Sequence, residues 1–237
     1  MRFQNRVALV TGGTGALGSA FTKMFLDEGA RVAVPVHRRR TVDRVEKSPV
    51  EELQKLLPVP ADLSRMEEAR ELVHKVLGEF QCVDYLIHTV GAYAGGKMIE
   101  EVSDEEWNRL MDLNLKSAFL MCNAVLPSMR ERGFGRIITI GAMPALRPTA
   151  KRGPYQISKR ALITLTETVA EEVKGSGITA NCIIPSTILT QDNVESMPDA
   201  DRSKWVTPEE IVALAAYLCT ADARSVNGNA IKIFGGA

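Results

Sequence analysis

Tyr155 and Lys159 stand four residues apart in the stretch GAMPALRPTAKRGPYQISKRAL, which runs from residue 141 to residue 162. On a helix this spacing places both side chains on the same face. A tyrosine hydroxyl has an ordinary pKa of about 10, and a nearby ammonium group stabilises the phenolate and lowers that pKa. The pair therefore predicts an acid/base unit, although this spacing alone also arises by chance.

A glycine-rich loop follows the first apolar run, residues 7–10, and has the sequence TGGTGALG. Gly13, Gly15 and Gly18 fit the pattern G-x-G-x-x-G between a predicted strand and a predicted amphipathic helix. Glycines at these positions bring main-chain N–H groups close to a pyrophosphate at a helix N-terminus. The loop predicts a dinucleotide site, and the alternative is a tight turn that binds no ligand.

The second predicted strand, residues 32–36, ends in a basic run and has no acidic residue there. An acidic residue at this point would bind the ribose hydroxyls of NAD. His37 and Arg38, followed by two more arginines, instead favour pairing with a 2′-phosphate. We therefore expect NADP as cofactor, with NAD possible, and the alternative is a solvated basic loop.

The elements around these residues alternate between apolar strands and amphipathic helices, which indicates a parallel sheet covered on both faces. Serine caps with a glutamate three residues on mark two of the helix starts, at Ser64 and Ser103. We predict strands at 7–10, 32–36, 59–61, 85–88, 136–140, 178–184 and 230–234, and helices at 16–28, 42–57, 64–80, 103–132, 154–174 and 207–219. Residues 1–237 are thus expected to form one α/β domain, a Rossmann-type doubly wound parallel sheet of about seven strands with helices on both faces, and residues 187–206 a mobile substrate loop.

Composition excludes several classes of function. Lysine plus arginine equals aspartate plus glutamate, 29 each, so no overall field draws in nucleic acid or an acidic membrane. The four cysteines lie far apart, without a C-x-x-C pair, as expected of core residues in a reducing compartment. The apolar run near the N-terminus is too short for a signal peptide, and we expect a cytoplasmic protein that meets no membrane.

Taken together, these segments resemble those of the short-chain dehydrogenase/reductase family. The resemblance covers nearly the whole chain and is specific because several motifs occur together. They are the glycine loop, Asp62-Leu63 after the third strand, Asn114 in MDLNLKSAF, the Tyr155/Lys159 pair, NCIIPSTILT from residue 181, and the ending VNGNAIKIFGGA.

The resemblance implies a role for each matching residue. Tyr155 would be the proton donor, Lys159 would lower its pKa and bind the nicotinamide ribose, and Asn114 would hold a water that relays protons. An alternative for Asn114 is an amide that satisfies nearby main chain. The implied cofactor-binding residues are Gly12, Gly13, Thr14, Gly15, Leu17, Gly18, His37, Arg38, Asp62, Leu63, Val90, Gly91, Tyr155, Lys159, Pro185, Ile188 and Thr190. No metal is expected, and family members commonly pair through the two long helices as dimers or tetramers.

The chain departs from the family pattern at three places. Ala142 stands thirteen residues before Tyr155, where the family usually has a serine that donates to the substrate carbonyl. The usual Asn-Asn-Ala-Gly is His88-Thr89-Val90-Gly91, and the usual Pro-Gly is Pro185-Ser186. Loss of a comparable donor costs roughly 2.7–4 kcal/mol of barrier, so ordinary ketone reduction is placed in question. His88 is expected to border the cofactor site, with proton transfer as the less favoured role.

The dihydropteridine-reductase-like branch of the family also has alanine in place of that serine. TVGAYAGG from residue 89 and NVESMPDADRSKWVTPEE from residue 193 resemble its segments. This likeness predicts an NAD(P)H-dependent oxidoreductase that transfers hydride to a small conjugated electrophile such as a quinonoid dihydropterin. That branch has an acid after its second strand, whereas this chain has His37-Arg38. The alternatives are a 3-oxoacyl thioester or carbonyl reductase and a non-catalytic NADP-binding regulatory protein.

Overall fold

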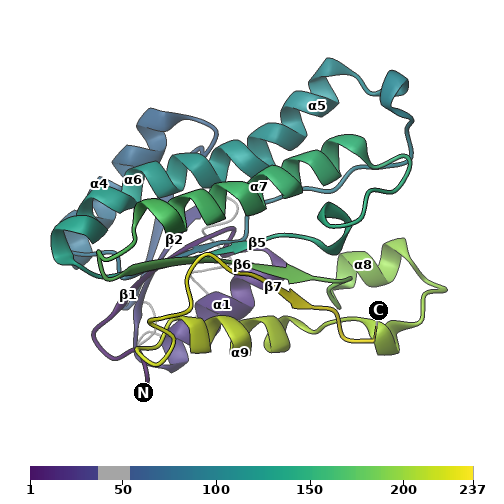
Figure 1. Ribbon diagram of the computed structural model, residues 1–237. Coiled ribbons are helices and arrows are strands. Elements are labelled where there is room, and N and C mark those ends of the chain that lie inside the picture. Colours follow the sequence, from purple (N-terminus) through teal and green to yellow (C-terminus); the bar gives the residue numbers. More distant parts are fainter. Residues whose placement is uncertain (37–53, 237) are drawn as a thin grey trace.

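The computed structural model describes residues 1–36 and 54–236. Within them the strands form one seven-stranded parallel sheet in the order β3-β2-β1-β4-β5-β6-β7 (Figure 1). The strands are β1 Val7–Thr11, β2 Arg31–Val36, β3 Leu56–Pro60, β4 Tyr85–His88, β5 Gly135–Ile140, β6 Ile178–Pro185 and β7 Ala230–Ile233. The strand order reverses between β1 and β4, and in such sheets ligands bind at the carboxyl ends of the strands beside that switch point.

Helices cover both faces of the sheet, as the alternating pattern predicts. The α-helices are α1 Ala16–Asp27, α4 Met66–Phe80, α5 Asp104–Met111, α6 Ser117–Arg132, α7 Gly153–Glu172, α8 Gln191–Ser196 and α9 Pro208–Leu218. Helices α1 and α9 lie against one face, and α4, α6 and α7 lie against the other (Figure 1). The doubly wound fold expected from the sequence is confirmed.

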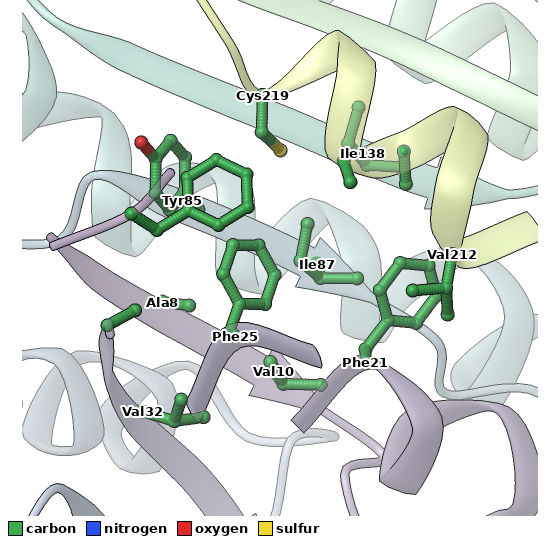
Figure 2. Packing of buried hydrophobic residues seen from close by; sticks show 14 of the residues in the cluster. Ala8, Val10, Phe21, Phe25, Val32, Tyr85, Ile87, Ile138, Val212 and Cys219 are labelled. Atoms are coloured by element: carbon green, nitrogen blue, oxygen red, sulfur yellow. The ribbon is translucent and has the colours of Figure 1, made fainter. Parts of the chain in front are cut away.

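Each face of the sheet has its own apolar core, because successive strand residues point to opposite sides. Figure 2 shows one of them, where Phe21 and Phe25 of α1 pack toward the sheet, Val212 comes from α9, and Cys219 follows directly after α9. The Phe25 and Tyr85 rings stack with centroids 5.4 Å apart. All four cysteines are buried free thiols, in agreement with the sequence expectation.

The end of one predicted helix and the start of the next differ from the structure around β3. The helix expected at 42–57 falls largely outside the described residues, but Leu56 and Leu57 belong to β3, where they pair with Val32 and Ala33. The cap expected at Ser64 is wrong. Helix α4 begins at Met66, and the Ser64 hydroxyl instead donates to Asp62 Oδ1 at 2.8 Å.

The helical region predicted at 103–132 is interrupted by a π-helical turn, Asp112–Lys116, between α5 and α6. Its start is correct, since Ser103 Oγ accepts a hydrogen bond from Glu106 N at 3.2 Å. A π turn adds a residue to the helical repeat and commonly occurs at functional positions. Here it contains the fully buried Asn114.

Residues 187–206 are more regular than predicted. They contain α8 and a 3-10 turn, Arg202–Lys204. A bridge joins Ile188 to Val206, with Leu189 N donating to Val206 O at 2.8 Å and Val206 N to Thr187 O at 2.9 Å. The two ends of the segment are therefore held together beside the carboxyl end of β6. Among the described helices, none is long and apolar enough to cross a membrane.

Candidate active site

The glycine loop forms a close main-chain cradle between β1 and α1. Gly12 has φ of +71°, and Gly15 N donates to Gly12 O at 2.9 Å. A methyl group added to Gly18 would lie 2.0 Å from Gly12 O, so only glycine allows α1 to start this close to the loop. The loop leads into the N-terminus of a 12-residue helix with Gly15 at its cap. This arrangement fits a pyrophosphate.

A pocket of about 240 Å³ opens beside this cradle, at the carboxyl ends of β1 to β4. It lies at the switch point, where open α/β sheets bind their ligands. The pocket is lined by Gly12, Thr14, Pro35, Ala61, Asp62, Leu63, Ser64, Val90, Asp112, Leu113 and Ser117. Five of the expected cofactor residues are among them (Gly12, Thr14, Asp62, Leu63 and Val90).

Lys159 is buried, and its ammonium donates to Ile140 O at the end of β5 at 2.8 Å. Burial lowers the pKa of Lys159 from 10.5 to about 8. A methyl group added to Gly91 would lie 3.0 Å from Lys159 Nζ and 2.9 Å from Asn114 Oδ1. Gly91 therefore lets the main chain after β4 pass close to the buried lysine and the buried amide, where any side chain would crowd both groups.

Tyr155 lies one helical turn before Lys159 on α7, as predicted. The pKa of Tyr155 is raised to about 12 by burial, and by Tyr93, whose ring meets it edge-on at 5.0 Å. The expectation that Lys159 lowers this pKa is not met in this structure. The physical reason is that the lysine hydrogen-bonds Ile140 O, while the positive charge of Arg152 lowers the Tyr155 pKa by less than burial raises it.

Asn114 uses its side chain on neighbouring main chain. Its Oδ1 accepts from Ala92 N at 2.8 Å, and its Nδ2 donates to Ala92 O at 3.0 Å and to Ser158 Oγ at 3.0 Å. Ser158 in turn donates to Tyr155 O at 2.9 Å. This is the alternative role that the sequence left open for Asn114, and it ties the end of β4 to the start of α7.

His88 is buried between β1 and α6. Its Nδ1 lies 2.9 Å from Thr11 Oγ1 and its Nε2 lies 3.1 Å from Ser117 Oγ. Because the Ser117 hydroxyl donates to Leu113 O, Nε2 carries the proton toward Ser117. Burial and the nearby Lys159 charge lower the pKa of His88 to about 3. The imidazole is thus a neutral link behind the pocket, which favours the non-catalytic role.

Ala142 is extended, with φ of −158° and ψ of 144°, and its methyl group is buried directly after β5. It supplies no hydrogen-bond donor from its side chain. Ser186, at the position of the usual glycine, donates from its hydroxyl to Phe234 O at 2.9 Å and from its main chain to Ile233 O at 3.1 Å. Ser186 thus fastens the segment after Pro185 to the last strand.

Ile188 and Thr190 begin the substrate-side segment. Thr190 Oγ1 caps α8 by accepting from Asn193 N at 3.3 Å, and Ile188 O accepts from Asn193 Nδ2 at 2.8 Å. These bonds fix the chain after β6. Contact of Ile188 and Thr190 with a nicotinamide remains a prediction.

The structure brings most expected residues to the carboxyl edge of the sheet, in two groups. One is the glycine loop and first turn of α1, with Gly13, Gly15, Leu17 and Gly18, and the other is Tyr155, Lys159 and Asn114. His37 and Arg38 lie outside the described residues. Sequence reasoning missed Ser117 and Ser158, which complete the hydrogen bonds of His88 and Asn114. Their spacing, three residues after Asn114 and three after Tyr155, was the available signal.

The chain is similar in sequence or structure to proteins that are named as dehydrogenases, reductases or oxidoreductases. Residues 6–201 match the short chain dehydrogenase family. Dehydrogenase/reductase SDR family member 4 of Oryctolagus cuniculus is 28% identical over 98% of this chain and 94% of its own length. The uncharacterized oxidoreductase YvrD of Bacillus subtilis (strain 168) is 30% identical over 100% of this chain and 97% of its own. A solved structure of a proposed 3-oxoacyl-reductase from Bacillus thuringiensis superposes with a TM-score of 0.86, at 29% identity over 98% of both chains.

Proposed function

The chain belongs to the short-chain dehydrogenase/reductase family and is an NAD(P)-dependent reductase, and we propose that it reduces a small conjugated electrophile with Tyr155 as proton donor. The observation that carries the choice of substrate is Ala142. A methyl group stands where the family's carbonyl-binding hydroxyl is expected, while Tyr155, Lys159 and Asn114 are all present. A quinonoid dihydropterin fits such a site, because a ring nitrogen takes the proton and little charge develops on a carbonyl oxygen.

In this proposal the glycine loop and the first turn of α1 hold the pyrophosphate, and the pocket at Asp62 and Leu63 holds the adenosine. A nicotinamide cofactor supplies the hydride when bound. Tyr155 delivers a proton from its hydroxyl to the substrate, and Lys159 binds the nicotinamide ribose from its place beside Gly91. With the cofactor bound, the lysine also assists ionisation of Tyr155.

The preferred cofactor is NADP. This rests on the sequence after β2, where His37 and Arg38 replace the acid that binds a free ribose. Fluorescence titration of NADPH and NADH tests it, and Arg38→Asp is expected to reverse the order of affinities. Tighter binding of NADH by the unchanged protein would contradict the preference.

Two exposed apolar side chains favour a homo-oligomer, and the buried free thiols favour a cytoplasmic location. Phe119 on α6 and Ile157 on α7 are each 45% exposed, which favours a second copy packing against these helices as a dimer or as part of a tetramer. The buried free cysteines suit a reducing compartment. Light scattering on the purified protein measures the mass of the assembly.

A second candidate function is reduction of a 3-oxoacyl thioester. The similarity to the Bacillus thuringiensis structure favours it, since that protein is described as a proposed 3-oxoacyl-reductase. Ala142 weighs against it, because a ketone oxygen gains more from a hydroxyl donor than a ring nitrogen does.

Oxidation of NADPH separates the two candidates when it is measured with quinonoid dihydropterin, quinones, diketones and an acetoacetyl thioester. We expect turnover of the conjugated compounds, lowered roughly 10²–10⁴-fold by Tyr155→Phe without loss of cofactor binding. Efficient turnover of the thioester alone would establish the second candidate. Unchanged turnover in the variant would remove Tyr155 from the mechanism.

A further inference from the structure

An exposed aromatic ring covers the proposed proton donor. Tyr93, in the segment after β4, is 59% exposed, yet its ring contacts the Tyr155 ring in a T-shaped arrangement, with 5.0 Å between centroids and 79° between planes. Because more than half of Tyr93 is open to water beside the proposed proton donor, its ring presents a flat surface to a bound substrate. Such surfaces bind flat conjugated rings by stacking.

The position of Tyr93 is fixed on both sides by main-chain hydrogen bonds. Before it, Ala92 is held by the Asn114 side chain through two hydrogen bonds. After it, Gly96 N donates to Lys151 O at 2.8 Å. A methyl group added to Gly95 would lie 2.6 Å from the Tyr93 hydroxyl, so the ring lies across a glycine that leaves room for it. A surface held in this way is prearranged for binding.

Arg152 lies beside this ring, one residue before α7. Its guanidinium carbon is 6.0 Å from the centre of the Tyr93 ring. It forms no ion pair with any residue of the described ranges. A guanidinium without a carboxylate partner is suited to a carboxylate or phosphate on a ligand, which it binds through two parallel hydrogen bonds.

We propose that Tyr93 and Arg152 form a substrate-recognition surface and that the substrate is a flat conjugated molecule bearing a carboxylate or phosphate group. The ring system stacks against Tyr93, and the anionic group binds Arg152. The substrate atom that takes the proton lies at the Tyr155 hydroxyl. This inference extends the proposed function by naming the substrate class. It assigns to Tyr93 and Arg152 roles in specificity and not in proton transfer.

Ligands that cannot be reduced test this surface independently of turnover. Calorimetric titration of the full chain with NADPH compares 2-naphthoate, 2-naphthyl phosphate and the uncharged 2-naphthamide. We expect at least one anion to bind more tightly than the amide, by up to about fivefold, the upper end of the range for a single exposed charge pair. Whichever anion binds more tightly identifies the group on the substrate. Added salt should reduce the advantage.

Two variants and a control separate the contribution of Arg152 to ligand affinity from that of Tyr93. Arg152→Gln should bring the anion and amide affinities together, whereas Tyr93→Ala should weaken all three ligands by a similar factor. Lys75→Gln, on the exposed face of α4, removes a positive charge elsewhere and should preserve the preference for anions. Thermal melting verifies that each variant is folded.

The outcomes separate this inference from the proposed function. A preference for anions that depends on Arg152, in a protein that reduces no electrophile, contradicts the proposed function and leaves the recognition surface in place. Reduction of uncharged quinones without any preference for anions overturns the recognition surface alone. Failure of all three ligands to bind, or a preference for anions that survives Arg152→Gln, also overturns it.

Discussion

The side-chain amide of Asn114 binds both main-chain groups of Ala92, accepting from Ala92 N at 2.8 Å and donating to Ala92 O at 3.0 Å. The amide belongs to a π turn, and the main chain that it binds lies in the segment after β4. This segment forms one wall of the site. Because Ser158 on α7 shares the same amide, three segments are joined by one buried side chain. Asn114 thereby positions the substrate side of the site.

Removing this amide is expected to destabilise the fold and to loosen the site. Asn114→Ala leaves the Ala92 N–H and C=O without partners and should lower the free energy of unfolding by roughly 2–4 kcal/mol. Ser158→Ala removes only one of the three hydrogen bonds and should cost about 1 kcal/mol. Urea denaturation measures both. Equal losses in the two variants would show that the bonds to Ala92 contribute little.

The sheet was predictable because its strands are buried on both faces and appear in the sequence as short continuous apolar runs. The glycine loop was predictable because its chemistry requires glycines at fixed positions. Gly18, for example, lies so close to Gly12 O that no side chain fits. Such features depend on residues that lie close together in the sequence, so the sequence pattern contains most of the information needed to predict them.

What the sequence did not reveal depends on contacts between distant segments. The π turn contains Asn114, whose side chain bonds the distant residues Ala92 and Ser158, and nothing in the local pattern distinguishes the turn from a continuous helix. In the protein without cofactor, the pKa of Tyr155 differs from the sequence expectation because burial raises it and Lys159 is hydrogen-bonded to Ile140 O. Helix spacing places two side chains on one face but does not determine where each side chain points.

Gly91 offers a test of the space between Lys159 and Asn114. Gly91→Ala places a methyl group 3.0 Å from Lys159 Nζ and 2.9 Å from Asn114 Oδ1, so one of these groups must move. We expect turnover to fall roughly 10-fold to 100-fold and NADPH to bind more weakly.

Gly78→Ala is the matched control, since nothing lies within 4 Å of the added methyl group on α4. It should leave turnover unchanged and stabilise the protein by about 0.5–1 kcal/mol. Full activity of Gly91→Ala would mean that the site tolerates a side chain there.

Lys159 should make stability depend on pH in a defined window. Its pKa is lowered to about 8 in the folded protein from 10.5, so between these values the unfolded chain binds more protons. The free energy of unfolding should therefore rise with pH from about 8 to 10.5, by at most about 3 kcal/mol, and stay level below that window as far as this lysine is concerned. Comparing the unchanged protein with Lys159→Met by denaturation at each pH, without cofactor, isolates this effect. Parallel curves for the two proteins would show that the lysine keeps its ordinary pKa.

Ala142 allows a direct test of the link between the missing hydroxyl and substrate choice. The residue is extended and its side chain is buried beside the end of β5, so serine fits the main-chain conformation without strain. If the site is specialised away from carbonyls, Ala142→Ser should raise kcat/KM for diketones or acetoacetyl thioesters. A well-placed donor is worth roughly 2.7–4 kcal/mol of barrier, and a poorly aligned one recovers part of it. The same change should do little for a quinonoid dihydropterin, whose proton comes from Tyr155.

Ala145→Ser serves as the control, because it adds a hydroxyl at another buried alanine three residues along the same segment. Efficient ketone reduction by the unchanged protein would instead mean that another donor replaces the serine, and an equal gain in both variants would show that the effect is not specific to position 142.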